Sequence, residues 1–379
     1  MNKFIYNDII TLLDSNLTYN LAESTSQDLK LQDVLSDSFF SELAKISLGY
    51  STSKGNSILR DLIGSKLDVH PDNVLITNGA SGAIFLTIMS LCSIGDEVIT
   101  TEPNFPCTLD IIPALGAVRK TVKVRFEDNF KLNIKELEEL LNLKTKLLIL
   151  VSPNNPTGTS QDLQTIMEIE KLVARKSPDA FILLDETYRE ATYGIAPARS
   201  VAGISERILS TSSLSKAHGS PGIRVGWLSC SHKVLMQQLT LAKMNSVISH
   251  SKVDEALAIE ILKCEKTLLL LKGEVLKGEV LKEELTIVEN WINKNERYIE
   301  WVKPDAGALC CVRLKKEMFS DEQVEKFYQS AKNNELQLAS GAWFGLDKRC
   351  IRLGFGFLPK EKLPVALKIF ESSFVCALK

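Results

Sequence analysis

The sequence predicts an α/β protein: a large domain with a mostly parallel central sheet covered by helices, and a smaller α+β domain. Apolar segments at residues 147–151, 181–184 and 208–209 each stop abruptly at polar or turn residues, and helix-like segments alternate with them. Strands that are apolar on both faces are typical of parallel sheets covered on both sides. Ligands bind such sheets at the carboxyl ends of the strands, so the residues after these segments are the first site candidates.

The other elements follow from apolar spacing and from residues that commonly begin helices. One long helical stretch contains the tandem LKGEVLKGEVLK, in which Gly273 and Gly278 weaken the helix locally. The expected helices are 7–13, 29–35, 57–67 with Ser57 as cap, one ending near 91, one after a cap at Asn133, and 253–282. The further expected strands are 20–22, 74–77, 97–100, 116–124, 225–228 and a set after residue 297 that includes a strand carrying Arg352.

The expected domains follow a change in composition near Leu285. Residues 1–45 are interpreted as an N-terminal arm and part of the small domain, residues 46–284 as the large domain, and residues 285–379 as the C-terminal small domain. A chain of 379 residues is long enough for two cores.

Composition excludes several classes of protein. Hydrophobic residues are 45% and charged residues 24% of the chain, with a net charge of −2, which gives no reason to expect nucleic acid or an anionic membrane as a partner. The N-terminus has acids inside its apolar pattern, unlike a secretory signal, and no apolar run is long enough to span a membrane. The eight cysteines are interpreted as reduced thiols of a cytoplasmic protein, with Cys310 and Cys311 on opposite faces of a strand. The four histidines lack metal-ligand spacing, so no metal is expected.

Lys216 lies between two apolar strands. Ser213 precedes it in a hydroxyl-rich turn, and Arg224 follows shortly before the second strand. Partial desolvation of a lysine favours its neutral amine and therefore Schiff-base chemistry. The hydroxyl, the lysine and the arginine could meet at one phosphate-bearing aldehyde; the alternative is a solvated surface lysine beside a turn.

Three other stretches suggest a site at the same edge of the sheet. The turn around Ala80 and Ser81 joins a strand to a helix, which places free N–H groups at an anion, although many such turns are glycine-rich. Asp185 follows four apolar residues and should face a cation or, alternatively, cap a turn. Phe105 belongs to the core or offers a face on which a flat ring stacks.

The ordered set NGASGA, EPNF, SPNNPTG, DETY, SLSK…GIRVGW and CIRLGF resembles the class I/II, fold-type I aminotransferase family over nearly the whole chain. The resemblance implies pyridoxal 5′-phosphate (PLP) as cofactor. It implies that Lys216 binds the cofactor aldehyde, that Asp185 pairs with the protonated pyridine nitrogen, and that Asn155 and Tyr188 contact the ring oxygen. Phe105 would stack on the ring, and Lys216, Asp185 and Tyr188 would be the catalytic residues.

The same resemblance assigns the residues around the phosphate and the substrate. Ala80 and Ser81 backbone groups, with the side chains of Ser213 and Arg224, would hold the phosphate. Tyr50 matches a tyrosine that reaches the phosphate of the neighbouring subunit, which implies a homodimer with shared active sites. The substrate would be a small molecule, an L-amino acid, bound by Arg352 at its α-carboxylate and also contacted by Asn155.

Three stretches depart from the usual family pattern: the N-terminal loop NLAESTS, the segment PDAGALCCVRL, and His218. The N-terminus and the overall length are similar to the cyclases that turn a hydroxylated arginine into capreomycidine or enduracididine, including those of guanitoxin biosynthesis. Such a site needs acids for the guanidinium, and Glu23 is the candidate; the alternative is a solvated loop acid.

Three functions follow. The leading one is cyclodehydration of γ-hydroxyarginine to enduracididine, in which protons leave Cα and Cβ, the γ-hydroxyl is expelled and a guanidine nitrogen adds. The alternative is ordinary transamination to a 2-oxo acid. A PLP-binding regulator or inactive scaffold is the third, and the intact set Lys216, Asp185 and Arg352 argues against it.

Overall fold

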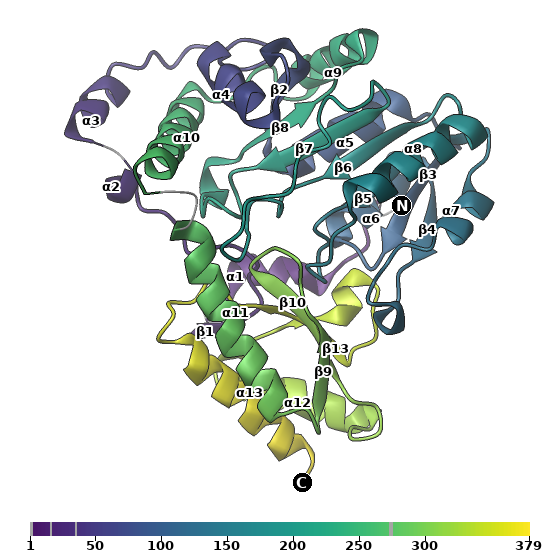
Figure 1. Cartoon of the computed structure of the whole chain (residues 1–379), viewed down its shortest axis with the longest axis vertical. Helices are drawn as coiled ribbons and strands as arrows, with labels where there is room; N and C mark the ends of the chain where they lie inside the picture. The colour runs from purple at the N-terminus through teal and green to yellow at the C-terminus, as the bar shows by residue number, and fades with distance from the viewer. Residues whose placement is uncertain (1–2, 16, 35, 273–275) are drawn as a thin grey trace.

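A seven-stranded sheet organises the first two thirds of the chain in the computed structural model, which describes residues 3–15, 17–34, 36–272 and 276–379 (Figure 1). Strand β8 is antiparallel to both of its neighbours and every other pair is parallel, as a mostly parallel sheet requires. In spatial order the strands are β2 (Val74–Asn78), β8 (Val225–Ser229), β7 (Ile208–Ser213), β6 (Phe181–Asp185), β5 (Thr145–Val151), β3 (Glu97–Glu102) and β4 (Val118–Lys123).

Helices cover both faces of this sheet. In β5, Leu148 and Leu150 pack in the cluster that contains residues of α7 and α8, whereas Ile149 packs in the cluster with residues of α5 and α9. Successive strand residues point to opposite faces, so both faces must be apolar. This explains the uninterrupted apolar runs in the sequence. The helices of this part are α4 (Ser57–Leu67), α5 (Gly79–Leu91), α6 (Pro106–Ala114), α7 (Ile134–Leu140), α8 (Leu163–Lys176), α9 (Lys233–Ser246) and α10 (Lys252–Lys272).

A four-stranded antiparallel sheet forms the second core, in the lower half of Figure 1. Its order is β12 (Ala339–Ser340), β13 (Cys350–Gly354), β10 (Leu309–Leu314) and β9 (Ile299–Val302), with helices α11 (Leu276–Lys294), α12 (Asp321–Asn333) and α13 (Leu363–Ala377). Phe327 and Phe370 are fully buried between sheet and helices. Cys310 packs in this core and Cys311 packs with the other cluster, which confirms that they lie on opposite faces.

The N-terminal segment joins the second core. Strand β1 (Tyr19–Asn20) pairs in parallel with β11 (Leu336–Gln337). The short helical elements before residue 45 are Asp8–Ile10, α1 (Thr11–Asp14), α2 (Leu31–Val34) and α3 (Asp37–Leu43), and the other 3₁₀ turns are Pro71–Asn73, Phe126–Asp128, Pro221–Ile223 and Gly341–Phe344. The expected division of the chain at residues 45 and 285 stays a prediction.

Several local expectations are tested directly. Asn133 caps α7 through its side chain, as expected. The cap of α4 is Asn56, not Ser57, because the Asn56 side chain accepts from the first amides of the helix. The helix expected over 253–282 corresponds to α10 and α11; Gly273 lies outside the described residues. Within the described residues, no helix is both long and apolar enough to cross a membrane.

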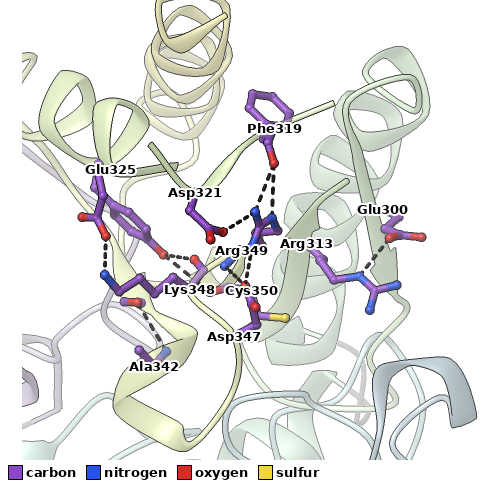
Figure 2. A network of polar contacts seen from close by, with 12 residues as sticks. Glu300, Arg313, Phe319, Asp321, Glu325, Ala342, Asp347, Lys348, Arg349 and Cys350 are labelled. Atoms are coloured by element: carbon purple, nitrogen blue, oxygen red, sulfur yellow. Dashed lines mark hydrogen bonds and ion pairs between the residues drawn. The ribbon is translucent and has the colours of Figure 1, made fainter. Parts of the chain in front are cut away.

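Two arginines hold the strand set of the second core in place (Figure 2). Arg349, just before β13, donates to the Phe319 carbonyl at 3.1 Å and pairs with Asp321. Arg313, on β10, pairs with Glu300 on β9 at 2.8 Å and with Glu127 of the large-sheet region at 2.6 Å. The first arginine fixes the beginning of β13, and the second joins the two sheet systems.

A buried acid on α11 makes stability depend on pH. Glu284 is 1% exposed and neither carboxylate oxygen has a hydrogen-bond partner. Burial raises its pKa from 4.5 to about 7, although Lys360 opposes the change. The folded-state pKa exceeds the unfolded one, so the contribution of Glu284 to stability is lost as pH rises from about 4.5 to about 7.

We therefore expect Glu284→Gln to increase the free energy of unfolding, and this increase should be about 2–3 kcal/mol larger at about pH 8 than at about pH 5. One pKa unit corresponds to about 1.4 kcal/mol. Urea unfolding at both pH values measures the difference. Glu283→Gln is the matched control, because Glu283 is exposed and pairs with Lys360 at the surface. Equal effects of the two substitutions would contradict the assignment.

Candidate active site

Three neighbouring parallel strands end at one edge of the large sheet and deliver the central residues of the site. Asp185 is the last residue of β6, Ser213 is the last residue of β7, and Asn155 follows β5. Lys216 lies in the turn after β7. Parallel strands that end together bring side chains far apart in the sequence into one place, as the sequence predicts.

Asp185 is held by the residues of its own turn. The amide of Thr187 donates to Asp185 Oδ1 at 3.0 Å, and the Thr187 hydroxyl donates to the same oxygen. Burial raises the pKa of Asp185, while the Thr187 hydrogen bonds and the charge of Lys216 oppose the rise. A desolvated carboxyl at a strand end is suited to bind a cationic N–H group of a ligand.

Lys216 is in contact with the N-terminal loop. Its Nζ lies 3.3 Å from Glu23 Oε1 and donates to Ser24 Oγ at 3.2 Å. Burial raises the pKa of Glu23, but the charges of Lys216 and Arg352 and the hydrogen bond from the Ser24 amide outweigh it, so the pKa lies below its ordinary value. Glu23 is therefore ionised at neutral pH and faces the lysine.

Arg352, on β13, is a buried cation at the centre of the site. It is 2% exposed; its Nη1 donates to Asn155 Oδ1 at 3.0 Å and its Nη2 donates to the Ala22 carbonyl. The guanidinium carbon lies 4.8 Å from the centre of the Phe344 ring, within cation–π range. Its Nε–H is buried without a hydrogen-bond partner, which leaves a donor for a carboxylate.

Hydrogen bonds connect these residues in one chain. Asn155 accepts from Arg352 and donates through Nδ2 to the Tyr188 hydroxyl at 3.2 Å. The Tyr188 hydroxyl shares a 3.0 Å hydrogen bond with Ser24 Oγ, which also accepts from Lys216. The predicted lysine, tyrosine, asparagine and arginine thus form a continuous network.

The turn between β2 and α5 is shaped to approach an anion. Helix α5 begins at Gly79 with no side-chain cap and no acid in its first turn, so its amides, including those of Ala80 and Ser81, face no competing carboxylate. A Cβ at Gly79 would lie 2.7 Å from Arg224 Nη2, which places the arginine beside this helix terminus. Ser213 is buried on the adjacent strand β7.

Two predicted residues lie outside the network. Phe105 precedes α6 and is partly buried, and its backbone N–H donates to Asn104 Oδ1 at 2.7 Å. Tyr50 is 78% exposed on a loop and contacts none of the site residues named above by a hydrogen bond. Its role in a neighbouring subunit stays a prediction.

The alternative of a solvated loop acid at Glu23 is wrong. Glu23 faces Lys216, and the next two residues of the same polar loop, Ser24 and Thr25, are 1% and 2% exposed. The loop is buried because the Ser26 amide donates to the Lys216 carbonyl at 3.1 Å, and the Leu29 amide donates to that of Gly219 at 2.8 Å. This contact between distant segments has no local sequence signal.

Sequence reasoning also missed Ser24, which bridges lysine and tyrosine, and Phe344, which lies under the arginine. His218, which departs from the family pattern, is buried 3.5 Å from Glu190 Oε2 and 3.4 Å from Lys66 Nζ. It belongs to a charged cluster behind the Lys216 turn.

The arrangement fits PLP. The phosphate needs free amides and a cation, which the start of α5 and Arg224 would supply. The pyridinium nitrogen needs an acid, which desolvated Asp185 would supply. The aldehyde needs an amine, which Lys216 would supply. None of these residues has the same charge as the part of the cofactor that it would contact.

A family model described as aminotransferase class I and II matches residues 16–370. The chain therefore belongs to this family.

Curated relatives and solved structures agree with this assignment. The aspartate aminotransferase of Thermotoga maritima is 30% identical over 59% of the chain and 64% of that protein, and that of Musicola paradisiaca is 30% identical over 52% and 51%. The chain thus aligns with about half to under two thirds of their lengths. A PLP-dependent aminotransferase from Streptococcus suis has a TM-score of 0.85 at 24% identity, covering 99% of this chain and 98% of that one. The PLP-dependent cyclase OrfR has a TM-score of 0.81 at 21% identity, covering 95% and 93%. At these identities the structures show the fold alone.

The close packing of β8 on α5 gives a test of the phosphate site. A Cβ at Gly226 would lie 2.4 Å from the Gly79 carbonyl carbon and 2.8 Å from the Ala80 nitrogen. Gly226→Ala must therefore displace the start of α5, and we expect PLP to bind about tenfold more weakly, or about 1.4 kcal/mol. Titration of the apoenzyme followed by absorbance measures this.

Gly222→Ala is the matched control, because a Cβ at Gly222 meets nothing within 4 Å. Unchanged PLP affinity in Gly226→Ala would mean that the start of α5 does not hold the phosphate.

Proposed function

We propose that this enzyme is a cyclodehydratase that acts on an L-amino acid with a cationic side chain and converts γ-hydroxyarginine to enduracididine. The observation that carries the proposal is the ionised Glu23 carboxylate, 3.3 Å from Lys216 Nζ and electrostatically coupled to Arg352. A carboxylate inside the site is the natural partner for a guanidinium group.

The charges suit a substrate with opposite charges at its two ends. Arg352 has a free Nε–H for the α-carboxylate, and Glu23 offers a carboxylate to a guanidinium side chain. An aspartate side chain would instead meet Glu23 with the same charge, which disfavours binding. The acid therefore favours an arginine-like substrate over a dicarboxylic one.

PLP, when bound, supplies an aldehyde for the substrate amine and a ring that accepts electrons from Cα. Asp185 would hold the ring nitrogen, while Asn155 and Tyr188 would contact the ring oxygen. Lys216, once its amine is neutral and free, would take the proton from Cα. Glu23 would hold the guanidinium near Cγ.

The proposed reaction balances without an oxidant or an amino acceptor. The Cβ–H and Cγ–O bonds break, and the γ-hydroxyl leaves as water. A guanidine nitrogen then forms a bond to Cγ and loses a proton, while Cβ regains a proton and Cα regains the one that Lys216 removed. Lys216, with Ser24 and Tyr188 in its hydrogen-bond network, is placed to move these protons.

Transamination is the second candidate. It is supported by the curated relatives named aspartate aminotransferase. The residues proposed around the cofactor would serve both reactions. The difference lies in the substrate-facing loop that carries Glu23.

We also propose a homodimer with shared active sites. Exposed apolar side chains gather on two segments, residues 48–50 and 241–248. A 3.2 Å hydrogen bond from the Ser51 amide to Ser249 Oγ joins the ends of these segments. An apolar surface of this kind is typical of a protein–protein interface. These side chains are Leu48, Tyr50, Leu241, Met244, Val247 and Ile248.

The reaction type is tested with a panel of amino acids that includes arginine and its β- and γ-hydroxy forms, without any 2-oxo acid. We expect repeated turnover of γ-hydroxyarginine with loss of one water, seen by mass, while the cofactor returns to its starting spectrum. Stoichiometric conversion of the cofactor to its amine form, reversed only by a 2-oxo acid, would instead establish transamination. Bound PLP without reaction on any amino acid would favour a regulator.

Glu23→Gln tests the recognition of the side chain. Removing the charge while keeping the shape should raise KM for the guanidino substrate by about tenfold or more, since a hydrogen bond to a charged group contributes about 1.5–3 kcal/mol. The measured quantity is the ratio of kcat/KM for the guanidino substrate to that for a neutral amino acid of similar length. An unchanged ratio would remove Glu23 from substrate recognition.

A further inference from the structure

A buried acid on α10 holds both ends of the loop that follows Tyr50. Glu255 is fully buried in the first turn of α10. Its Oε2 accepts a hydrogen bond from the Ser51 hydroxyl, and its Oε1 accepts the Asn56 amide at 3.0 Å. One carboxylate therefore ties residues 51 and 56 to a single point on α10.

The same loop is pressed against the large sheet. The Ile76 amide, on β2, donates to the Lys54 carbonyl at 2.9 Å. Gly55 has a φ of +100°, and a Cβ there would lie 2.3 Å from Ile76 Cγ1 and 3.0 Å from Glu255 Oε1. The loop thus packs directly against β2 and Glu255 at Gly55, and the Glu255 carboxylate holds Ser51, the residue that follows Tyr50.

A second buried charge accompanies Glu255. Lys243, on α9, is fully buried and its Nζ has no hydrogen-bond partner. Burial lowers its pKa to about 8 and the charge of Glu255 opposes the change. Burying two charges costs free energy, and apolar residues would fill the same space without that cost. Holding a surface loop by a buried carboxylate therefore costs stability. This cost is reasonable where the loop must be held in one accurate position.

The loop is also connected to the phosphate site of its own subunit. The Ser51 amide donates to Ser249 Oγ at 3.2 Å, and the next residue, His250, donates through Nε2 to the Arg224 carbonyl at 3.1 Å. Segment 249–250 therefore joins the residue beside Tyr50 to the arginine that lies at the start of α5. Tyr50 itself points outward, 78% exposed.

We infer that Glu255 is a positioning residue for cofactor binding: through Ser51 it holds Tyr50 where its hydroxyl reaches the phosphate in the second subunit. This inference rests on the proposed homodimer with shared sites. Glu255 touches neither substrate nor cofactor in this arrangement, so its effect on the cofactor passes through Tyr50.

The test is the rate at which the holoenzyme releases PLP, measured by absorbance after dilution into a trap for free PLP. We expect Glu255→Gln and Tyr50→Phe each to speed release about tenfold, or about 1.4 kcal/mol of barrier. The double variant should release PLP no faster than Tyr50→Phe alone, because without the hydroxyl there is nothing left to position. Asp254→Asn, the same change at the adjacent residue of α10, should release PLP at the wild-type rate.

The outcomes separate the two proposals. Two results would overturn the role of Glu255 and leave the shared site standing. One is that the effects of Glu255→Gln and Tyr50→Phe on PLP release add. The other is that Glu255→Gln releases PLP at the wild-type rate while Tyr50→Phe releases it fast. A wild-type rate in Tyr50→Phe, with a mass near 42.1 kDa by light scattering, would overturn both.

Ser51→Ala provides a second route if Glu255→Gln fails to fold, because it removes one hydroxyl and leaves the buried carboxylate in place. It should also speed PLP release, and its effect should likewise vanish in the Tyr50→Phe background. An effect of Ser51→Ala that persists without the Tyr50 hydroxyl would overturn the inference. Thermal unfolding of each apoenzyme shows whether a variant has lost the fold itself.

Discussion

The burial of one guanidinium group constrains the whole arrangement. Arg352 has almost no contact with water, and an unpaired charge in such a place costs several kcal/mol. The charge is accommodated by the Ala22 carbonyl, the Asn155 side chain and the face of Phe344. These partners come from the N-terminal segment, from the loop after β5 of the large sheet, and from the turn Gly341–Phe344 between two strands of the small sheet. The three parts must therefore come together for the arginine to be tolerated.

The electrostatics of the proposed site follow from this arrangement. Glu23 contacts Lys216, and the charges of Lys216 and Arg352 both lower its pKa. A carboxylate in that position balances the buried arginine before any ligand arrives. In the proposed reaction the substrate brings its own carboxylate to Arg352 and its own cation to Glu23, so net charge in the site is preserved while Lys216 is released to act as a base.

Local patterns in the sequence predicted the features that local physics determines. The apolar run before Asp185 predicted a strand that ends in a desolvated acid, and Asn133 was identified as a cap from its position alone. The burial of Ser24 was not predictable, because it depends on backbone contacts with the Lys216 turn, almost 200 residues away. A short polar loop gives no sign of such a contact. The one-residue error at Asn56 reflects two adjacent residues that can both cap a helix.

The pairing of the two chain ends has a consequence for biosynthesis. The hydrogen bond between Ala22 and Arg352 spans 330 residues, and β1 pairs with β11, which lies more than 300 residues further along the chain. A ribosome makes residues 19–23 long before β13, and contacts between such distant residues form late. The growing chain therefore carries Glu23 without its lysine partner until the Lys216 turn, 193 residues further on, has been made. The substrate side of the pocket is complete only once β13, which carries Arg352, has also emerged.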